Sequence, residues 1–175
     1  GIPESAFVVS YVGRHNEIKG FGDLVSAAPV LLDRFEDLWF LNAGKTTPLQ
    51  GLSHNRWVEV GWTNDPHSII SAADVFVLPN KETYFDLILL EAMSLGQLVF
   101  ASETGGNRFF SKYSLPGLRL FSDVRELPEL VDRIRRVPID TRRSWGDLNR
   151  SIFEKYFSCK AFAGEYLKMI GSLEG

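Results

Sequence analysis

The stretch that decides the fold is "DVFVLPNKETYFDLILLEAMSLGQLVFAS", residues 74–102. It begins with a short apolar run, continues with apolar residues at helical spacing that stop at Gly96, and ends with a second apolar run. Short runs rich in β-branched and aromatic residues are typical of strands, and nearly continuous apolar runs are typical of strands covered on both faces. A glycine after the last periodic residue is typical of a helix end. The stretch therefore predicts a strand, a helix and a second buried strand.

The same alternation extends in both directions along the chain. Further strand-like runs occur at residues 6–13, 38–44, 58–62 and 118–121, of which the last is the weakest and is expected as an edge strand or a loop. Helical spacing occurs at residues 20–35, 66–74, 124–137 and 140–173, with Pro29 expected to bend or shorten the first of these helices. Alternating strands and helices form right-handed parallel crossovers. We therefore predict an α/β fold, a Rossmann-like doubly wound parallel sheet of about six strands with helices on both faces.

Length and composition place the chain among single-domain globular proteins. The 175 residues favour one domain, and the net charge of −3 gives no reason to expect nucleic acid as a partner. A single cysteine excludes an intrachain disulfide and a metal site built on cysteines. No apolar stretch approaches the ~20 residues of a membrane span, and the opening "GIPES" lacks the features of a signal peptide. We expect a cytoplasmic domain, at most peripheral at the inner face of the membrane.

The loops that directly follow the strands are where a ligand is expected, because doubly wound sheets bind ligands outside the carboxyl ends of their strands. After the first run, residues 13–20 carry Arg14 and Lys19 just before a predicted helix. The unpaired N–H groups and the dipole of a helix start attract anions, and both side chains are cations. The sequence therefore predicts an anion site here. The alternative is a solvated loop whose basic residues bind nothing specific.

The loop after the fourth run leads into the predicted helix from about Tyr84 to Leu95. Thr83 is expected to be the N-cap, and Asp86 completes a pattern similar to a capping box. Glu91 then lies at the margin of the buried face of this helix, where a carboxylate needs hydrogen-bond donors. The two hydroxyls of a ribose are one such set of donors. A structural salt bridge to Arg or Lys is the alternative.

Three further groups of residues have open interpretations. Gly105 and Gly106, after the fifth run, either present N–H groups to an anion or form an ordinary tight turn. Trp62, after the third run, either stacks on a base or packs on the surface. His15 and His67 are expected to be polar surface residues rather than catalytic bases.

Taken together and in this order, the segments resemble the C-terminal half of a GT-B glycosyltransferase of the retaining, family 4 type (glycosyl transferases group 1). The matching pieces are "VGRHNEIKG", "VEVGW", "AADVFVLPN", "TYFDLILLEAMSLGQLVFAS" and "TGGN". The resemblance covers about residues 7–110 and the C-terminal helix "FSCKAFAGEYLKMIGSL". It implies the donor-binding domain of an enzyme that moves a sugar from a nucleotide-diphosphate sugar to an acceptor hydroxyl with retention, in bacterial polysaccharide or glycoconjugate biosynthesis.

The resemblance also implies roles for individual residues. Arg14 and Lys19 match the catalytic cations that grip the donor diphosphate, and Glu91 matches the residue that binds the ribose. The remaining positions that the resemblance places at the donor are Gly13, Trp62, Glu82, Thr83, Phe85, Asp86, Leu87, Thr104, Gly105, Gly106 and Asn107.

The sequence departs from the family pattern at the positions that handle the donor sugar. Thr83 stands where the motif has its first Glu, so either its hydroxyl or the neighbouring Glu82 is expected to contact the sugar. Asp86 stands where the motif has Gly, which places an acid beside the expected pyrophosphate. Capping geometry or contact with sugar hydroxyls is expected to relieve that repulsion. Phe109 stands where the family has a further Glu.

The resemblance implies a UDP- or GDP-sugar as the partner and no metal or other cofactor. It also implies an N-terminal acceptor domain that these 175 residues do not contain, with tail helices at about residues 140–173 that pack back on the single domain. We expect the chain alone to be inactive. The alternative is a non-catalytic nucleotide or nucleotide-sugar binding module with a regulatory role. A receiver-like domain is disfavoured because it needs an acidic cluster where this chain has Arg14.

Overall fold

The computed structural model describes residues 1–172, so Leu173, the last residue of the predicted tail helix, lies outside the described part. The strands are β1 (Phe7–Val12), β2 (Leu38–Ala43), β3 (Trp57–Gly61), β4 (Val75–Leu78), β5 (Val99–Ser102) and β6 (Leu118–Phe121). The α-helices are α1 (Phe21–Arg34), α2 (Pro66–Ser71), α3 (Leu87–Ser94), α4 (Leu127–Arg135), α5 (Ile139–Tyr156) and α6 (Cys159–Gly171). Two 3₁₀ helices are η1 (Gly105–Tyr113) and η2 (Val124–Glu126).

The six strands form one parallel sheet in the order β3-β2-β1-β4-β5-β6. This arrangement confirms the predicted doubly wound fold, and the weak run at residues 118–121 is an edge strand. The direction of winding reverses between β1 and β4, which pair through Val9 and Val75. At such a switch point the loops after the two strands diverge and leave a crevice, so the topology itself selects the place for a ligand.

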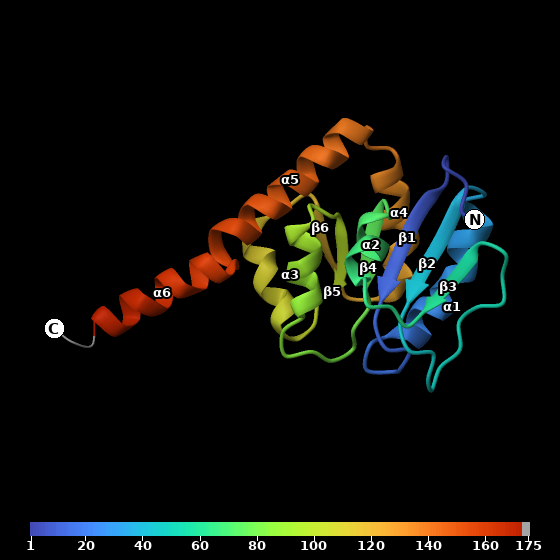
Figure 1. Cartoon of the computed structure of the whole chain (residues 1–175). Coiled ribbons are helices and arrows are strands. Elements are labelled where there is room, and N and C mark those ends of the chain that lie inside the picture. Colours follow the sequence, from blue (N-terminus) through green and yellow to red (C-terminus); the bar gives the residue numbers. More distant parts are fainter. Residues whose placement is uncertain (173–175) are drawn as a thin grey trace.

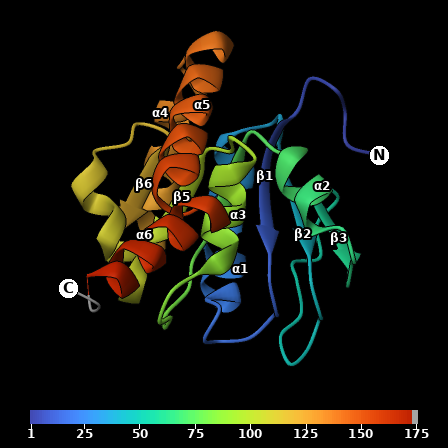
Figure 2. The same cartoon turned by 60° about the vertical axis from the view of Figure 1, so that its left-hand side comes forward.

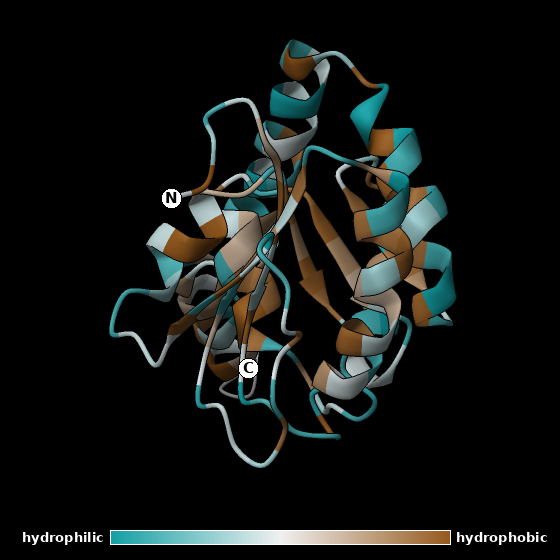
Figure 3. Cartoon of the chain, turned by 90° about the vertical axis from the view of Figure 1, so that its right-hand side faces the viewer, coloured by the Kyte–Doolittle hydropathy of each residue, from teal (hydrophilic) through white to brown (hydrophobic). Residues whose placement is uncertain are grey.

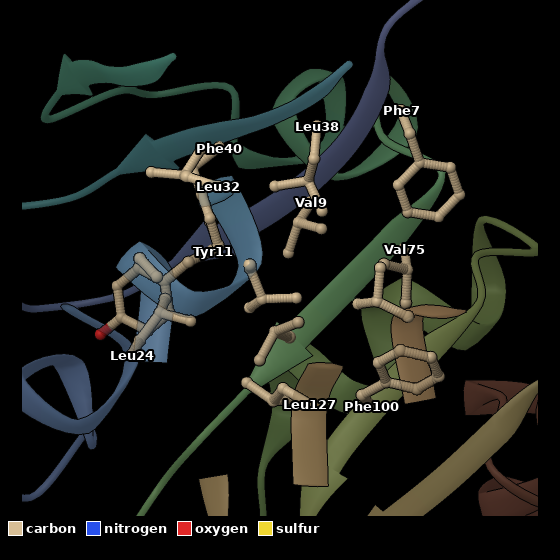
Figure 4. Close-up of a cluster of buried hydrophobic side chains, with 14 of the residues drawn as sticks. Phe7, Val9, Tyr11, Leu24, Leu32, Leu38, Phe40, Val75, Phe100 and Leu127 are labelled. Carbon is tan, nitrogen blue, oxygen red and sulfur yellow. The ribbon is translucent and has the colours of Figure 1, made fainter. Parts of the chain in front are cut away.

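Helices cover both faces of the sheet (Figures 1 and 2). Alternate residues of β4 belong to different cores, because successive side chains of a strand point to opposite faces. Val75 and Val77 join the core beneath α1 and α4, whereas Phe76 joins the core beneath α2 and α3. Figure 3 shows hydrophobic residues concentrated on the central strands, and Figure 4 shows the first of the two cores, to which Tyr11 of β1 and Leu24 of α1 both belong.

Three local features differ from the sequence prediction. Helix α3 begins at Leu87, not at Tyr84, because the side chain of Asp86 is engaged elsewhere and caps no backbone N–H. The segment after β5, for which a tight turn was one of two interpretations, continues into η1. Of the bend or shortening expected at Pro29, shortening does not occur, because α1 runs through this residue to Arg34. Pro29 lies on the exposed side of the helix, where water can satisfy the carbonyl it leaves free.

The two tail helices differ in how they contact the domain. Helix α5 packs on α3, where a Cβ added to Gly146 would lie 2.0 Å from the carbonyl oxygen of Gly96. Asn149 is fully buried there, and its Nδ2 donates to the carbonyl oxygens of Gln97 and Gly117 at 2.8 and 3.0 Å. Helix α6 buries none of its residues and extends away from the body of the domain (Figure 1). Over residues 1–172, no helix has the length and apolar character to cross a membrane.

Candidate functional site

A cleft of about 840 Å³ lies at the switch point of the sheet. It is lined by Val12, Gly13, Arg14, Ile18, Lys19, Glu82, Thr83, Tyr84, Phe85, Asp86, Leu87, Ile88 and Glu91. A second hollow of about 380 Å³ shares part of this lining and continues to Lys45, Trp62 and Pro66. The loops after β1, β2, β3 and β4 thus surround one continuous depression, as the strand order requires.

The two predicted cations line this cleft together but differ in their surroundings. Arg14 is exposed, and its guanidinium contacts no acid among the described residues. The ammonium of Lys19 lies 3.5 Å from Oδ1 of Asp86. Arg14 is therefore ready to bind an anion, whereas Lys19 already has an internal one.

The loop that carries these cations is fixed by its neighbours. The hydroxyl of Tyr11 donates to the carbonyl oxygen of Arg14 at 2.8 Å. The backbone N–H of His15 donates to the carbonyl oxygen of Lys45 at 3.1 Å. At the other end of the loop, Gly20 has φ +63°, and a Cβ there would lie 1.7 Å from the carbonyl oxygen of Pro79. The loop after β1 is thus held against the loops after β2 and β4.

His15 was expected on the surface, and this expectation is wrong. Its ring is fully buried and stacks on Phe21 with 3.7 Å between ring centroids. Burial lowers the pKa of His15, so the ring is neutral at pH 7. Burial also raises the pKa of Glu59, whose carboxylate is 3.7 Å from His15 Nε2. His15 thus packs against Phe21 beneath the loop and does not line the cleft. His67, as expected, is exposed.

Asp86 is the most densely contacted polar side chain of the cleft, and only 3% of it is exposed. Asn80 Nδ2 lies 2.6 Å from each carboxylate oxygen, and Asn107 Nδ2 donates to Oδ2 at 3.0 Å. The hydroxyl of Thr83 donates to Oδ1 at 3.0 Å. The prediction of Thr83 as N-cap in a capping box with Asp86 is therefore wrong, because the two side chains contact each other and the N-cap of α3 is Asp86.

The residues after β5, expected at the donor, lie behind the wall of the cleft and do not line it. Gly105 has φ +47°, and its Cα approaches the loop after β4 so closely that a Cβ would lie 1.7 Å from the carbonyl oxygen of Thr83. The N–H of Gly106 donates to the carbonyl oxygen of Tyr84 at 3.0 Å. Asn107 is buried behind Asp86. Thr104 donates to the carbonyl oxygen of Lys81 and lines a neighbouring hollow.

Glu91 lines the cleft but is less buried than expected, because 45% of its side chain is exposed. Its carboxylate lies 3.2 Å from Nε2 of His67. The alternative reading of Glu91 named Arg or Lys as its partner, and neither occupies that position. An exposed acid with one neighbour on an exposed histidine retains free acceptor capacity for hydroxyl groups.

Trp62 is 71% exposed and borders the smaller hollow, where a flat ligand group has access to its ring. Lys45 borders the same hollow and was missed, although it directly follows the run at residues 38–44. The rule that ligands bind after strands identifies Lys45 when it is applied to every strand. Within residues 1–172, no three His, Cys, Asp or Glu side chains gather closely enough to share a metal ion.

The curated proteins that match this chain are named glycosyltransferases. The chain is 26% identical over 178 aligned positions to the lipopolysaccharide core biosynthesis glycosyltransferase LpsE of Rhizobium meliloti, which covers 97% of this chain and 51% of the relative. It is 27% identical to the UDP-Gal:alpha-D-GlcNAc-diphosphoundecaprenol alpha-1,3-galactosyltransferase of Escherichia coli, over 80% of this chain and 38% of the relative. The chain thus spans about half, or less, of the length of these curated relatives.

Solved structures show the same fold. The sucrose-phosphate synthase of Thermosynechococcus elongatus superposes with a TM-score of 0.79 at 25% identity, over 98% of this chain and 46% of that one. Anabaena Alr3699/HepE, solved in complex with UDP and glucose, superposes with a TM-score of 0.77 at 17% identity, over 95% and 48% of the two chains. The sequence pattern of the family "Glycosyl transferases group 1" matches residues 6–137. Because this match covers well over half of the chain, the chain belongs to the glycosyl transferases of group 1.

Proposed function

We propose that this chain is the donor-binding part of a glycosyltransferase that transfers a sugar, with retention, from a nucleotide-diphosphate sugar to an acceptor hydroxyl. The observation that carries the proposal is the cleft at the switch point, where Arg14, Lys19 and Glu91 share one lining. The E. coli relative carries a UDP-sugar in its name, which supports a nucleotide-sugar donor. The name of the R. meliloti relative supports a role in bacterial polysaccharide or glycoconjugate synthesis.

In this proposal the parts of the donor follow the chemistry of the cleft. The diphosphate lies against Arg14, Lys19 and the N–H groups at the start of α3, because these are its positive groups. The ribose hydroxyls donate to Glu91. The base lies in the smaller hollow beside Trp62, where an exposed indole ring offers a stacking surface.

The donor sugar is assigned to Glu82 rather than to Thr83. The hydroxyl of Thr83 already donates to Asp86 at 3.0 Å, whereas Glu82 is exposed at the edge of the cleft. A free carboxylate accepts hydrogen bonds from two sugar hydroxyls, and the engaged threonine has less capacity to do so.

The catalytic contribution of this half is electrostatic. When the bond between the sugar and the β-phosphate breaks, negative charge grows on the phosphate oxygens of the leaving nucleoside diphosphate. Arg14 and Lys19 are preorganised on a fixed loop next to these oxygens, and such groups lower the barrier most when charge develops beside them. Lys19→Ala in the complete enzyme is expected to lower kcat/KM by a factor equivalent to ~3–4 kcal/mol. An unchanged kcat/KM would contradict this role.

A non-catalytic binding module is the second candidate function, because Thr83 and Asp86 replace the motif's Glu and Gly. Turnover by the complete enzyme separates the two functions, since a binding module would retain donor affinity without releasing nucleoside diphosphate.

Calorimetry of the chain against a panel of UDP- and GDP-sugars tests the donor site directly. Glu91→Ala is expected to weaken donor binding at least about tenfold, since a hydrogen bond to a charged group contributes about 1.5–3 kcal/mol. Glu165→Ala is the matched control, because Glu165 lies on α6 and pairs with Lys168, away from the cleft. No binding of any nucleotide sugar, or equal affinities for the wild type and Glu91→Ala, would refute the proposed site.

A further inference from the structure

The charges of the cleft do not match an anionic ligand in a simple way. Its lining contains two cations, Arg14 and Lys19, but three acids, Glu82, Asp86 and Glu91. Of these acids, Asp86 is the buried one and lies at the start of α3, where the proposed diphosphate would also be attracted. A second anion at this position would raise the free energy of binding a diphosphate, unless Asp86 has another task.

The contacts of Asp86 indicate that task. Its partners come from three different crossover loops: Lys19 follows β1, Asn80 and Thr83 follow β4, and Asn107 follows β5. Among residues 1–172, the side-chain carbonyl oxygens of Asn80 and Asn107 are buried without a hydrogen-bond partner, while both amide nitrogens donate to Asp86. The site thus tolerates two unpaired buried oxygens in order to solvate one carboxylate.

Lys19 is the loosest of these partners. Its ammonium is 3.5 Å from Oδ1, farther than any of the other donors, and 29% of its side chain is exposed. If Lys19 leaves, Asp86 keeps the donors of Asn80, Thr83 and Asn107. A buried carboxylate is strongly unfavourable only when it is left without donors, so Lys19 can be released at small cost.

We propose that Asp86 is an internal counter-ion that positions Lys19 before a ligand binds and competes with the phosphate groups of the ligand for it. Asp86 is therefore a positioning residue that sets the affinity for anions, and it does not bind the donor sugar. This inference rests on the proposed function, because it takes the ligand to be a nucleoside diphosphate or its sugar ester. Asn80 and Asn107 are the residues that continue to donate hydrogen bonds to the carboxylate when Lys19 moves to the ligand.

A double-mutant cycle with UDP tests the competition. Asp86→Asn keeps the size of the side chain and removes its charge, so UDP binding measured by calorimetry is expected to tighten about tenfold, which corresponds to about 1.4 kcal/mol. The same substitution in the Lys19→Met background is expected to change the affinity for UDP less than twofold. Uridine, which has no phosphate, serves as the control ligand. Equal effects in both backgrounds, or weaker UDP binding by Asp86→Asn, would overturn the proposal.

Thr83→Val gives a test with the opposite sign. It removes the hydroxyl that donates to Oδ1 and leaves the charge of Asp86 in place, so the carboxylate depends more on Lys19. UDP binding is expected to weaken at least about threefold, which is less than the roughly tenfold or more that a full hydrogen bond to a charged group contributes, because Asn80 and Asn107 still donate to the carboxylate. Tighter UDP binding by Thr83→Val would contradict the competition.

A stability measurement without ligand separates this inference from the proposed function. Urea unfolding of the wild type, Asp86→Asn, Lys19→Met and the double variant is expected to show coupling of at least about fivefold in the unfolding equilibrium constant. Additive effects would refute the pairing of Lys19 with Asp86, whatever the ligand is. If neither UDP nor inorganic pyrophosphate binds any of the four chains, the proposed function fails, and the unfolding cycle alone then decides whether Asp86 holds Lys19.

Discussion

Gly105→Ala is the substitution that tests most directly how the wall of the cleft is built. The new Cβ would lie 1.7 Å from the carbonyl oxygen of Thr83, whereas real Cβ contacts stay beyond 3.0 Å. The obstacle is backbone, so no rotamer change relieves it, and the loop after β4 has to retreat. Residue 105 also has φ +47°, in the left-handed region. Retreat of the loop displaces Thr83 and the surroundings of Asp86.

Two costs set the expected loss of stability: the left-handed backbone at residue 105 and the overlap of the new Cβ with the loop after β4. A left-handed conformation costs a residue with a Cβ about 1–2 kcal/mol, and forcing extra volume into packed structure costs about 1–3 kcal/mol. The free energy of unfolding is therefore expected to fall by about 2–5 kcal/mol. Urea unfolding followed by circular dichroism measures this quantity, and calorimetry with UDP is expected to show binding weakened at least about tenfold.

Gly164→Ala is the matched control for the same chemical change. Gly164 lies in α6, where none of the atoms of residues 1–172 lies within 4 Å of an added Cβ, and alanine favours a helix over glycine by about 1 kcal/mol. The control chain is expected to be at least as stable as the wild type. If Gly105→Ala unfolds within about 0.5 kcal/mol of the wild type, the range of ordinary surface substitutions, the close approach of the two loops is not a structural constraint and the reasoning is refuted.

Two further predictions concern the buried polar groups. The pKa of His15 is lowered by burial, so between its ordinary value of 6.5 and its lower value in the folded chain only the unfolded chain binds the proton, and stability falls as the pH drops. Between about pH 7.5 and pH 5.5, the free energy of unfolding is expected to fall more for the wild type than for His15→Phe. The raised pKa of Glu59 acts with the opposite sign in both chains. Equal losses of stability in the two chains would contradict the assignment of this pH dependence to His15. Asn149→Ala removes the side-chain donor of the Gln97 carbonyl oxygen, whereas the carbonyl oxygen of Gly117 still accepts from the N–H of Val99, so the free energy of unfolding in urea is expected to fall by about 1–3 kcal/mol. Asn55→Ala, on the surface, is the control, and similar losses for both would show that Asn149 does not anchor α5.

The sheet could be predicted from the sequence because its strands are covered on both faces and read as continuous apolar runs. The edge strand at residues 118–121 was the weakest signal, since exposed Arg119 interrupts its apolar pattern. The start of α3 could not be predicted, because Asp86 takes its donors from Asn80 and from Asn107, 21 residues away, and no local pattern encodes that choice.

The location of the candidate site followed from the rule on loops after strands, but the surroundings of its side chains did not. His15 looks like a surface residue in a polar loop, and its burial depends on a stack with Phe21 that forms only when α1 docks. Glu91 lies at the margin of a helix face, where a small rotation decides between burial and exposure. The residues after β5 were expected to touch the ligand, and their actual contacts with the loop after β4 are tertiary.

The main-chain approaches at Gly20 and Gly105 have a consequence for anyone who wishes to change what the cleft accepts. Because the carbonyls of Pro79 and Thr83 occupy the space that a side chain would need, the inner outline of the cavity cannot be tuned by mutating these two glycines. Diversity in a directed-evolution library belongs instead at the outer rim, at Trp62, Tyr84 and Leu87, which are 71%, 102% and 68% exposed. New selectivity is therefore expected to come from substitutions at this outer rim, while the backbone around Gly20 and Gly105 stays unchanged.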